Sequence, residues 1–96
     1  IGLTMTVASE VCEHNIQVNA ICPGPVEGER TQAVFEHRAH ALGQTFDEVQ
    51  QNYLDQMALK RLVRPDDVAA MVAFLASSEA DNITGQAIEV SAGWGL

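Results

Sequence analysis

The apolar residues at the start of the chain recur with the spacing of a helix. Leu3, Val7 and Val11 fall on one face within residues 1–14. Asn15 follows them, and asparagine tolerates the left-handed conformation that often ends a helix. The pattern predicts a helix over residues 1–14. Since no helix-start signal precedes it, we expect the sequence to begin inside a longer chain.

Residues 16–22 read Ile-Gln-Val-Asn-Ala-Ile-Cys, a stretch rich in β-branched side chains. Pro23 and Gly24 follow it directly, so the pattern predicts a strand that runs into a turn. Pro25 and Gly28 prolong the irregular stretch. Its backbone N–H and C=O groups are not committed to regular structure, and we expect this loop to be available for binding.

Two helices should come next and form a hairpin. Residues 29–42 have the helical pattern, with Gly43 just past their end. Thr45 and Glu48 have the spacing of a capping box, in which the hydroxyl and the carboxylate each accept a hydrogen bond from a backbone N–H. The spacing puts four residues of the first helix on related faces and repeats four more in the second, so we expect a hairpin with an apolar inner side: Ala33, Val34, Arg38 and Leu42, then Val49, Tyr53, Leu54 and Met57.

The last part of the chain predicts one more helix and one more strand. Pro65 suits the first position of a helix, and Asp66 and Asp67 complement the positive end of its dipole. The helix is apolar on most faces, which favours packing between a sheet and another layer. Residues 81–85 have turn chemistry, and residues 86–91 predict a second strand.

The order of these elements defines the fold class. Two strands that are separated by a helical hairpin and a helix are expected to lie parallel, joined by a right-handed crossover, as in an α/β sheet. With 96 residues the chain holds at most one small domain. A sheet of two strands needs further strands to cover its edges, so more sequence should contribute to it.

Composition restricts the classes of function. Hydrophobic residues make up 47% and charged residues 19%, which is typical of a globular protein. The net charge of -8 argues against nucleic acid and acidic lipid as partners, because both are held by clustered Lys and Arg. The sequence has neither an apolar run of roughly 18 residues nor a basic signal flank, so we expect no membrane span and a cytoplasmic protein.

The sequence offers no strong metal or disulfide motif. Cys12 and Cys22 each lie in an apolar stretch, where cysteine commonly serves as a small hydrophobe. His37 and His40 share a helical face, but they lack a Glu-x-x-His context. We therefore predict that no metal is bound.

Four segments resemble one family in one order. Residues 16–24, with Val-Asn-Ala-Ile-Cys-Pro-Gly, resemble the strand-to-loop segment of short-chain dehydrogenases/reductases. Residues 2–10 are similar to the helix that follows the family's Tyr-x-x-x-Lys motif. Residues 64–69 with 74–77, and residues 83–86, resemble its closing helix and strand. The four landmarks cover nearly the whole chain.

The resemblance implies a doubly wound, Rossmann-like parallel sheet, of which residues 1–96 form the C-terminal part. That part comprises the last two strands, their flanking helices and a helical lid over the substrate at residues 29–61. The family binds NAD or NADP, and the residues that distinguish the two follow an earlier strand outside this sequence. The intact protein is expected to be a homo-oligomer, a dimer or a tetramer, with residues 1–14 and the closing helix and strand at subunit contacts.

The resemblance also assigns a cofactor site. Pro23, Gly24, Pro25 and Val26 would lie against the nicotinamide, whose carboxamide would be held by backbone groups. Asn19 has a structural role in the family, tying backbone segments together. Two departures stand out: Gly28 replaces a frequent threonine that meets the cofactor, and Ser91-Ala92 replaces a frequent Asp-Gly.

The family's reaction is hydride transfer between nicotinamide and a carbonyl or alcohol carbon, with tyrosine as acid/base and lysine lowering its pKa. Those residues are absent here: Tyr53 is followed four positions later by Met57, and Lys60 is seven positions away. A Gly-rich phosphate loop is also missing. We assign no catalytic residue and expect the 96 residues alone to be inactive.

Two charged residues are candidates for substrate binding. Glu27 and Arg30 are the charged groups nearest the proposed nicotinamide loop, and Arg30 is hypothesised to contact an anionic or polyhydroxylated substrate. The alternative for Arg30 is an ion pair with a nearby acid at the start of the helix. Trp94 is expected to anchor a subunit contact or the lid.

The second function is a non-enzymatic helical interaction module that docks on a partner.

Overall fold

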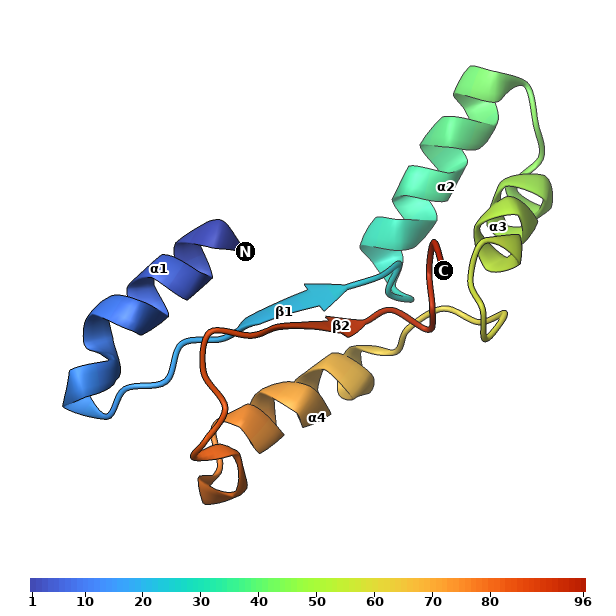
Figure 1. Cartoon of the computed structure of the whole chain (residues 1–96). Coiled ribbons are helices and arrows are strands. Elements are labelled where there is room, and N and C mark those ends of the chain that lie inside the picture. The colour runs from blue at the N-terminus through green and yellow to red at the C-terminus, as the bar shows by residue number, and fades with distance from the viewer. The chain divides into compact units, whose positions relative to one another are not determined.

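The computed structural model describes residues 1–96 and has the predicted order of elements (Figure 1). Its helices and strands are α1 (Gly2–Val11), the 3-10 helix η1 (Cys12–His14), β1 (Ala20–Pro23), α2 (Glu29–Leu42), α3 (Phe46–Asp55), α4 (Pro65–Leu75), the 3-10 helix η2 (Ser78–Ala80) and β2 (Ala87–Val90). The residues group into two compact units. The first unit contains Ile1–Cys22 and Asp66–Val90, and the second contains Pro23–Pro65 and Ser91–Leu96.

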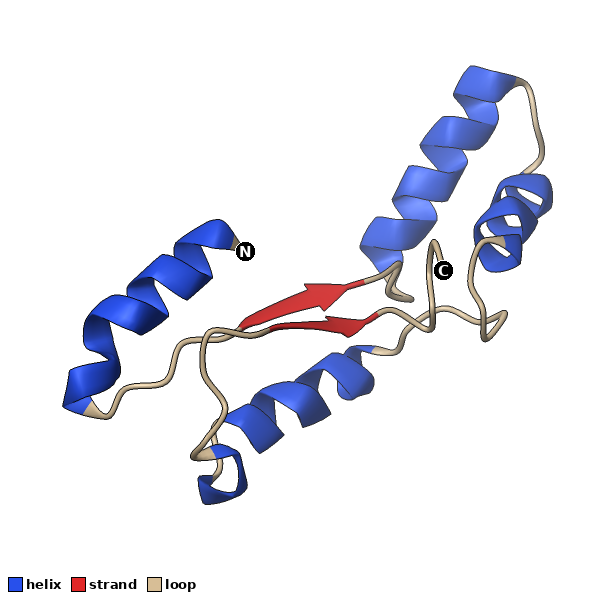
Figure 2. Ribbon diagram, viewed as in Figure 1, coloured by secondary structure: helices blue, strands red, loops and turns tan.

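In the first unit, β1 and β2 pair as a parallel two-stranded sheet (Figure 2). Both strands are shorter than the predicted residues 16–22 and 86–91. Ahead of β1 the chain is held by irregular contacts: the Val18 N–H donates to the Thr84 hydroxyl at 3.1 Å, and the Gly85 N–H donates to the Val18 carbonyl at 2.8 Å. The predicted strand bounds were wrong because a side chain and a turn replace the ladder there.

Asn19 connects the two segments that enter the strands. Its side-chain Nδ2 donates to the Ile83 carbonyl at 3.0 Å, and its Oδ1 accepts from the Gln86 N–H at 3.1 Å. One amide thus satisfies a donor and an acceptor on the opposite backbone. The predicted structural role of Asn19 is confirmed.

The helices of the first unit follow their local signals but bury little. Asn15 adopts the left-handed conformation, with φ 57°, just after η1, and α4 begins at Pro65 as predicted. Ala8 is the buried residue of α1, and α4 has none. Large apolar side chains remain exposed, as at Leu3 (75%) and Val72 (52%). None of the helices has the length and hydrophobicity that crossing a membrane requires.

The second unit is built on the predicted helical hairpin, and Figure 1 shows α2 and α3 side by side. Phe35, Ala39 and Val49 form its buried cluster, with Phe46, Tyr53 and Leu62 packed around it. The expected inner face was wrong in part, because Val34 and Leu42 are 43% and 61% exposed while Phe35 is 1% exposed. Helical spacing alone does not fix which neighbouring residue faces the partner helix.

The caps of the hairpin helices match the sequence, with one difference. Gly43 ends α2 in the left-handed conformation, with φ 65°. At the start of α3, the Thr45 hydroxyl oxygen accepts from the Glu48 N–H at 3.1 Å. The Glu48 carboxylate accepts from the Thr45 hydroxyl at 3.2 Å, whereas a full capping box directs it to a backbone N–H. Only half of the predicted capping box is present.

Candidate functional site

A cavity of about 240 Å³ lies in the second unit, where the chain leaves β1. Its walls are Pro23, Gly24 and Pro25 from the loop, Arg30, Thr31, Val34 and Phe35 from α2, and Tyr53 and Trp94 from α3 and the tail. The loop contributes apolar surface, and the wall also contains three aromatic rings and one guanidinium. Three of the four residues that the sequence assigned to the cofactor thus line one cavity together with Arg30.

The loop after β1 is fixed by pairing with the segment before α4. The Val63 N–H donates to the Pro25 carbonyl at 2.9 Å, and the Glu27 N–H donates to the Val63 carbonyl at 2.8 Å. Val26 pairs with Val63 in this short parallel bridge. The Thr31 hydroxyl donates to the Val26 carbonyl. Val26 does not line the cavity, and its N–H takes part in no backbone hydrogen bond of the loop.

Gly24 is required by a close approach of two backbones. A Cβ on Gly24 would lie 2.9 Å from the Ser91 Cα and 3.0 Å from the Ser91 carbonyl oxygen. Contacts this short force a shift of backbone atoms. The Pro-Gly turn is therefore held against the residue that follows β2, which keeps the loop wall of the cavity in one position.

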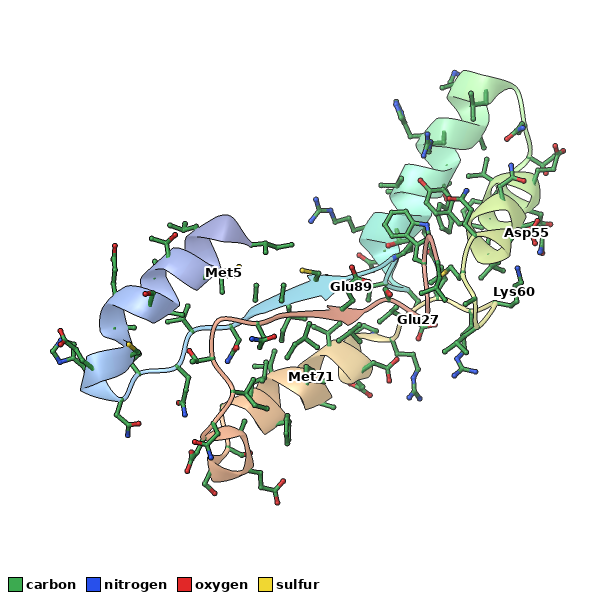
Figure 3. The ribbon with its side chains drawn as sticks, in the orientation of Figure 1. Met5, Glu27, Asp55, Lys60, Met71 and Glu89 are labelled. Atoms are coloured by element: carbon green, nitrogen blue, oxygen red, sulfur yellow. The ribbon has the colours of Figure 1, made fainter.

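The two candidate substrate residues lie in different surroundings. Arg30 lines the cavity and is exposed, and it forms no hydrogen bond or ion pair. Its guanidinium is thus available to a ligand, and the alternative ion pair with a nearby acid does not form. Glu27, labelled in Figure 3, is exposed in the loop between β1 and α2 and does not line the cavity.

The tail of residues 91–96 is attached to the segment that follows α3. The Ala58 N–H donates to the Gly93 carbonyl at 3.2 Å, and the Leu59 N–H donates to the Ala92 carbonyl at 3.0 Å. Trp94, which forms an isolated antiparallel bridge with Met57, is placed by these bonds in the cavity wall. The sequence pattern gave no sign of this pairing, because neither segment alternates like a strand.

Tyr53 and Lys60 are held by separate partners. The Tyr53 hydroxyl accepts from the Arg38 guanidinium, and the Lys60 Nζ donates to the Asp55 carbonyl at 2.7 Å (Figure 3). These two residues therefore do not form the tyrosine-lysine pair of the family. No group of three or more His, Cys, Asp or Glu is arranged to hold a metal ion. Both cysteines are free thiols.

The parallel strands and the surrounding helices define an α/β protein. In open parallel sheets of this class, ligands bind outside the carboxyl ends of the strands. A family model described as enoyl-(acyl carrier protein) reductase matches residues 1–95. The chain belongs to the short-chain dehydrogenase/reductase family.

Curated relatives match over nearly the whole chain. A short-chain dehydrogenase/reductase of Armillaria gallica is 41% identical over 92 residues, which are 96% of this chain and 34% of that protein. A 3-oxoacyl-(acyl-carrier-protein) reductase of Staphylococcus epidermidis is 40% identical over 93 residues, which are 97% of this chain and 34% of that protein. The chain thus spans about a third of the length of these relatives.

Solved structures support the same family. A short-chain dehydrogenase family protein from Francisella tularensis has a TM-score of 0.89 at 29% identity, covering 96% of this chain and 38% of that one. L-sorbose reductase from Gluconobacter frateurii, solved with NADPH and L-sorbose, has a TM-score of 0.83 at 28% identity, covering 96% and 35%. The predicted family and the α/β class with parallel strands are confirmed.

Proposed function

We propose that this chain is the C-terminal part of an NAD(P)-dependent oxidoreductase that acts on a small carbonyl or alcohol substrate. The observation that carries the proposal is a cavity in which the Pro-Gly loop after β1 meets Arg30 and three aromatic rings. Residues 29–61 then act as the lid over the substrate. Family membership supports the cofactor class, since L-sorbose reductase was solved with NADPH.

The residues that line the cavity suit a nicotinamide ring chemically. Pro23 and Pro25 present rigid apolar rings without N–H groups, which suits a flat ring better than a charged group. Val26 lies outside the cavity wall, and its N–H makes no backbone hydrogen bond of the loop, so it would serve a carboxamide that projects beyond that wall. When bound, the cofactor supplies or accepts the hydride. The part of Pro23, Gly24, Pro25 and Val26 is to hold and orient the ring.

Substrate binding falls to the charged residues beside the loop. Arg30 has an unengaged guanidinium at the cavity, and such a group can hold an oxyanion or a pair of hydroxyls in fixed geometry. Glu27 is exposed and lies three positions before Arg30, so it is the second charged group that a substrate at Arg30 could meet. The Tyr-x-x-x-Lys motif is absent from the 96 residues. By themselves they are expected to turn over no carbonyl substrate.

The exposed apolar surface of the first unit is expected to be covered by the rest of the sheet and by a second copy of the protein. Side chains such as Leu3 and Met5 of α1 and Val72 and Phe74 of α4 are more than a third exposed. A homo-oligomer would cover them. A non-enzymatic interaction module would also explain these faces, but it gives no reason for a cavity lined by the Pro-Gly loop and Arg30.

Filling the cavity tests the cofactor assignment. Val34→Trp adds a bulky side chain at an exposed position of the cavity wall, so the fold should tolerate it while the bound ring is crowded. In the full-length protein we expect the Kd for NADH or NADPH to rise about tenfold or more, equivalent to about 1.4 kcal/mol. Titration of the protein fluorescence measures it. Ala33→Trp is the control, because Ala33 is exposed and outside the cavity wall. Equal binding by the two variants would contradict the assignment.

Removing the guanidinium tests the substrate role of Arg30. Arg30→Ala in the full-length enzyme should raise KM for a hydroxylated or acidic carbonyl substrate about tenfold, since a hydrogen bond to a charged group is worth about 1.5–3 kcal/mol. The Kd for NADPH should not change. Arg61→Ala is the matched control, because Arg61 is exposed and does not line the cavity. Unchanged steady-state kinetics in Arg30→Ala would end the hypothesis.

A further inference from the structure

Trp94 is the residue of the C-terminal tail that lines the cavity beside the Pro-Gly loop. The backbone on both sides of it is fixed. Ahead of it, the Gly93 carbonyl accepts from the Ala58 N–H at 3.2 Å. Behind it, the Gly95 N–H donates to the Gln56 carbonyl at 3.0 Å. The place of Trp94 in the wall is therefore set by backbone hydrogen bonds and does not depend on burial of its own indole ring.

The three aromatic rings of the cavity wall differ in how much surface they leave uncovered. Phe35 is 1% exposed, and its ring pairs with those of Tyr53 and Phe46. The ring of Tyr53 is partly buried, and its hydroxyl accepts from the Arg38 guanidinium. Trp94 is 43% exposed and has no ring partner. Trp94 thus offers the largest uncovered aromatic surface of the wall.

This part of the wall suits an apolar group of a ligand. Val34, which also lines the cavity, is likewise 43% exposed. The indole of Trp94 carries a single polar group, an N–H donor, on a large apolar body. Covering such surface with another apolar group removes it from water, which is favourable. The charged side chain of the same wall is Arg30, so the cavity provides separate places for a polar and an apolar part of one small molecule.

We propose that Trp94 is a specificity-determining residue whose indole contacts the apolar substituent next to the reacting carbon of a small ketone or secondary alcohol. The inference deepens the proposed function and rests on it, since it presupposes a carbonyl or alcohol substrate at the Pro-Gly loop. It adds a residue of the tail to the substrate site. It also adds an apolar substituent to the chemistry of the substrate.

Two methyl ketones test the proposal with the full-length enzyme at saturating NADPH or NADH. The second group on the carbonyl carbon is ethyl in one ketone and butyl in the other. We expect kcat/KM for the butyl ketone to exceed that for the ethyl ketone about tenfold, because two further methylenes cover the indole. Saturation with cofactor ensures that a change in cofactor affinity cannot imitate a change in this preference.

Replacing Trp94 should remove the preference for the butyl ketone. In Trp94→Ala and in Trp94→Gln the ratio of the two kcat/KM values should fall to about threefold or less, because the apolar ring is gone. Trp94→Phe should keep most of the preference, since phenylalanine still presents an aromatic face. Leu96→Ala is the matched control, because Leu96 belongs to the same tail, is 100% exposed and does not line the cavity. Its ratio should equal that of the unchanged enzyme.

Melting temperature and size-exclusion chromatography exclude other causes of the effect. The Trp94 variants should fold, because the hydrogen bonds that fix the tail involve only backbone atoms and the indole is 43% exposed. They should also elute as the unchanged protein does. Dissociation of an oligomer in Trp94→Ala would assign the indole to a contact between subunits and would overturn the inference.

The kinetic outcomes separate the inference from the function on which it rests. Failure to bind NAD(P)H or to reduce either ketone would overturn the proposed function and the inference with it. Reduction of both ketones with the same preference before and after Trp94→Ala would overturn only the role of Trp94. A preference for the butyl ketone that increases in Trp94→Ala would show that the indole obstructs the substituent, and it would overturn that role as well.

Discussion

Gly93→Ala is expected to lower the free energy of unfolding by about 3 kcal/mol, the sum of a strained backbone and a steric overlap. Gly93 has φ +75°, a conformation that residues with a side chain rarely adopt. A Cβ there would lie 2.5 Å from the Ala58 Cβ and 3.4 Å from the Ala58 Cα. The overlap falls where the Ala58 N–H donates to the Gly93 carbonyl, so the attachment of the tail is strained.

Urea unfolding of the full-length protein measures the loss, and two variants separate its causes. Gly95 has the same φ of +75° but nothing within 4 Å of its Cβ position, so Gly95→Ala should cost only the backbone term of about 1 kcal/mol. Ala58→Gly combined with Gly93→Ala should recover the steric part. Equal losses in Gly93→Ala and Gly95→Ala would show that the tail does not approach Ala58.

The same variant should weaken substrate and cofactor binding together. Trp94 follows Gly93 directly and lines the cavity beside the Pro-Gly loop. A displaced tail moves this wall. KM and the Kd for NADPH should therefore rise in Gly93→Ala but remain unchanged in Gly95→Ala, which distinguishes a positioned wall from a general loss of stability.

Elements with a local signal at each end could be predicted from the sequence, and those that depend on distant partners could not. The helix α2 has its predicted bounds, Glu29–Leu42, because Gly43 ends it in a conformation that glycine adopts freely. The strand β1 is shorter than predicted, because Asn19 and Thr84 take over the pairing ahead of it. These hydrogen bonds join residues that are 66 and 67 positions apart, and they leave no trace in the alternation of side chains.

The candidate site likewise has a part that could be predicted from the sequence and a part that could not. Pro23, Gly24 and Pro25 were assigned to the cofactor by family resemblance, and Arg30 was placed near them by its position in the sequence. The structure brings all four residues into the wall of one cavity, and their roles in binding stay predictions. Tyr53 and Trp94, which face that cavity, could not be assigned from the sequence. Their position depends on the packing of α3 against α2 and on the backbone pairing of the tail.

Phe35→Ala is expected to lower the free energy of unfolding by about 4 kcal/mol, the cost of removing a fully buried aromatic ring and leaving a cavity. Phe35 is 1% exposed. Its ring centre lies 4.7 Å from that of Tyr53 and 5.8 Å from that of Phe46, so one side chain joins α2 to both ends of α3. Such ring pairs add about 0.5–1.5 kcal/mol each beyond the buried area.

Thermal and urea unfolding of the full-length protein test this expectation against Val34→Ala, a neighbouring position that is 43% exposed and should cost less than about 1 kcal/mol. Phe35→Leu should lower the free energy of unfolding by less than Phe35→Ala and by more than Val34→Ala, because leucine refills part of the space. Phe35 also lines the cavity beside the Pro-Gly loop, and its loss frees the Tyr53 ring. Substrate KM should therefore rise in Phe35→Ala at temperatures where the protein is still folded. A loss of stability no larger than that of Val34→Ala would show that the hairpin does not close on this ring.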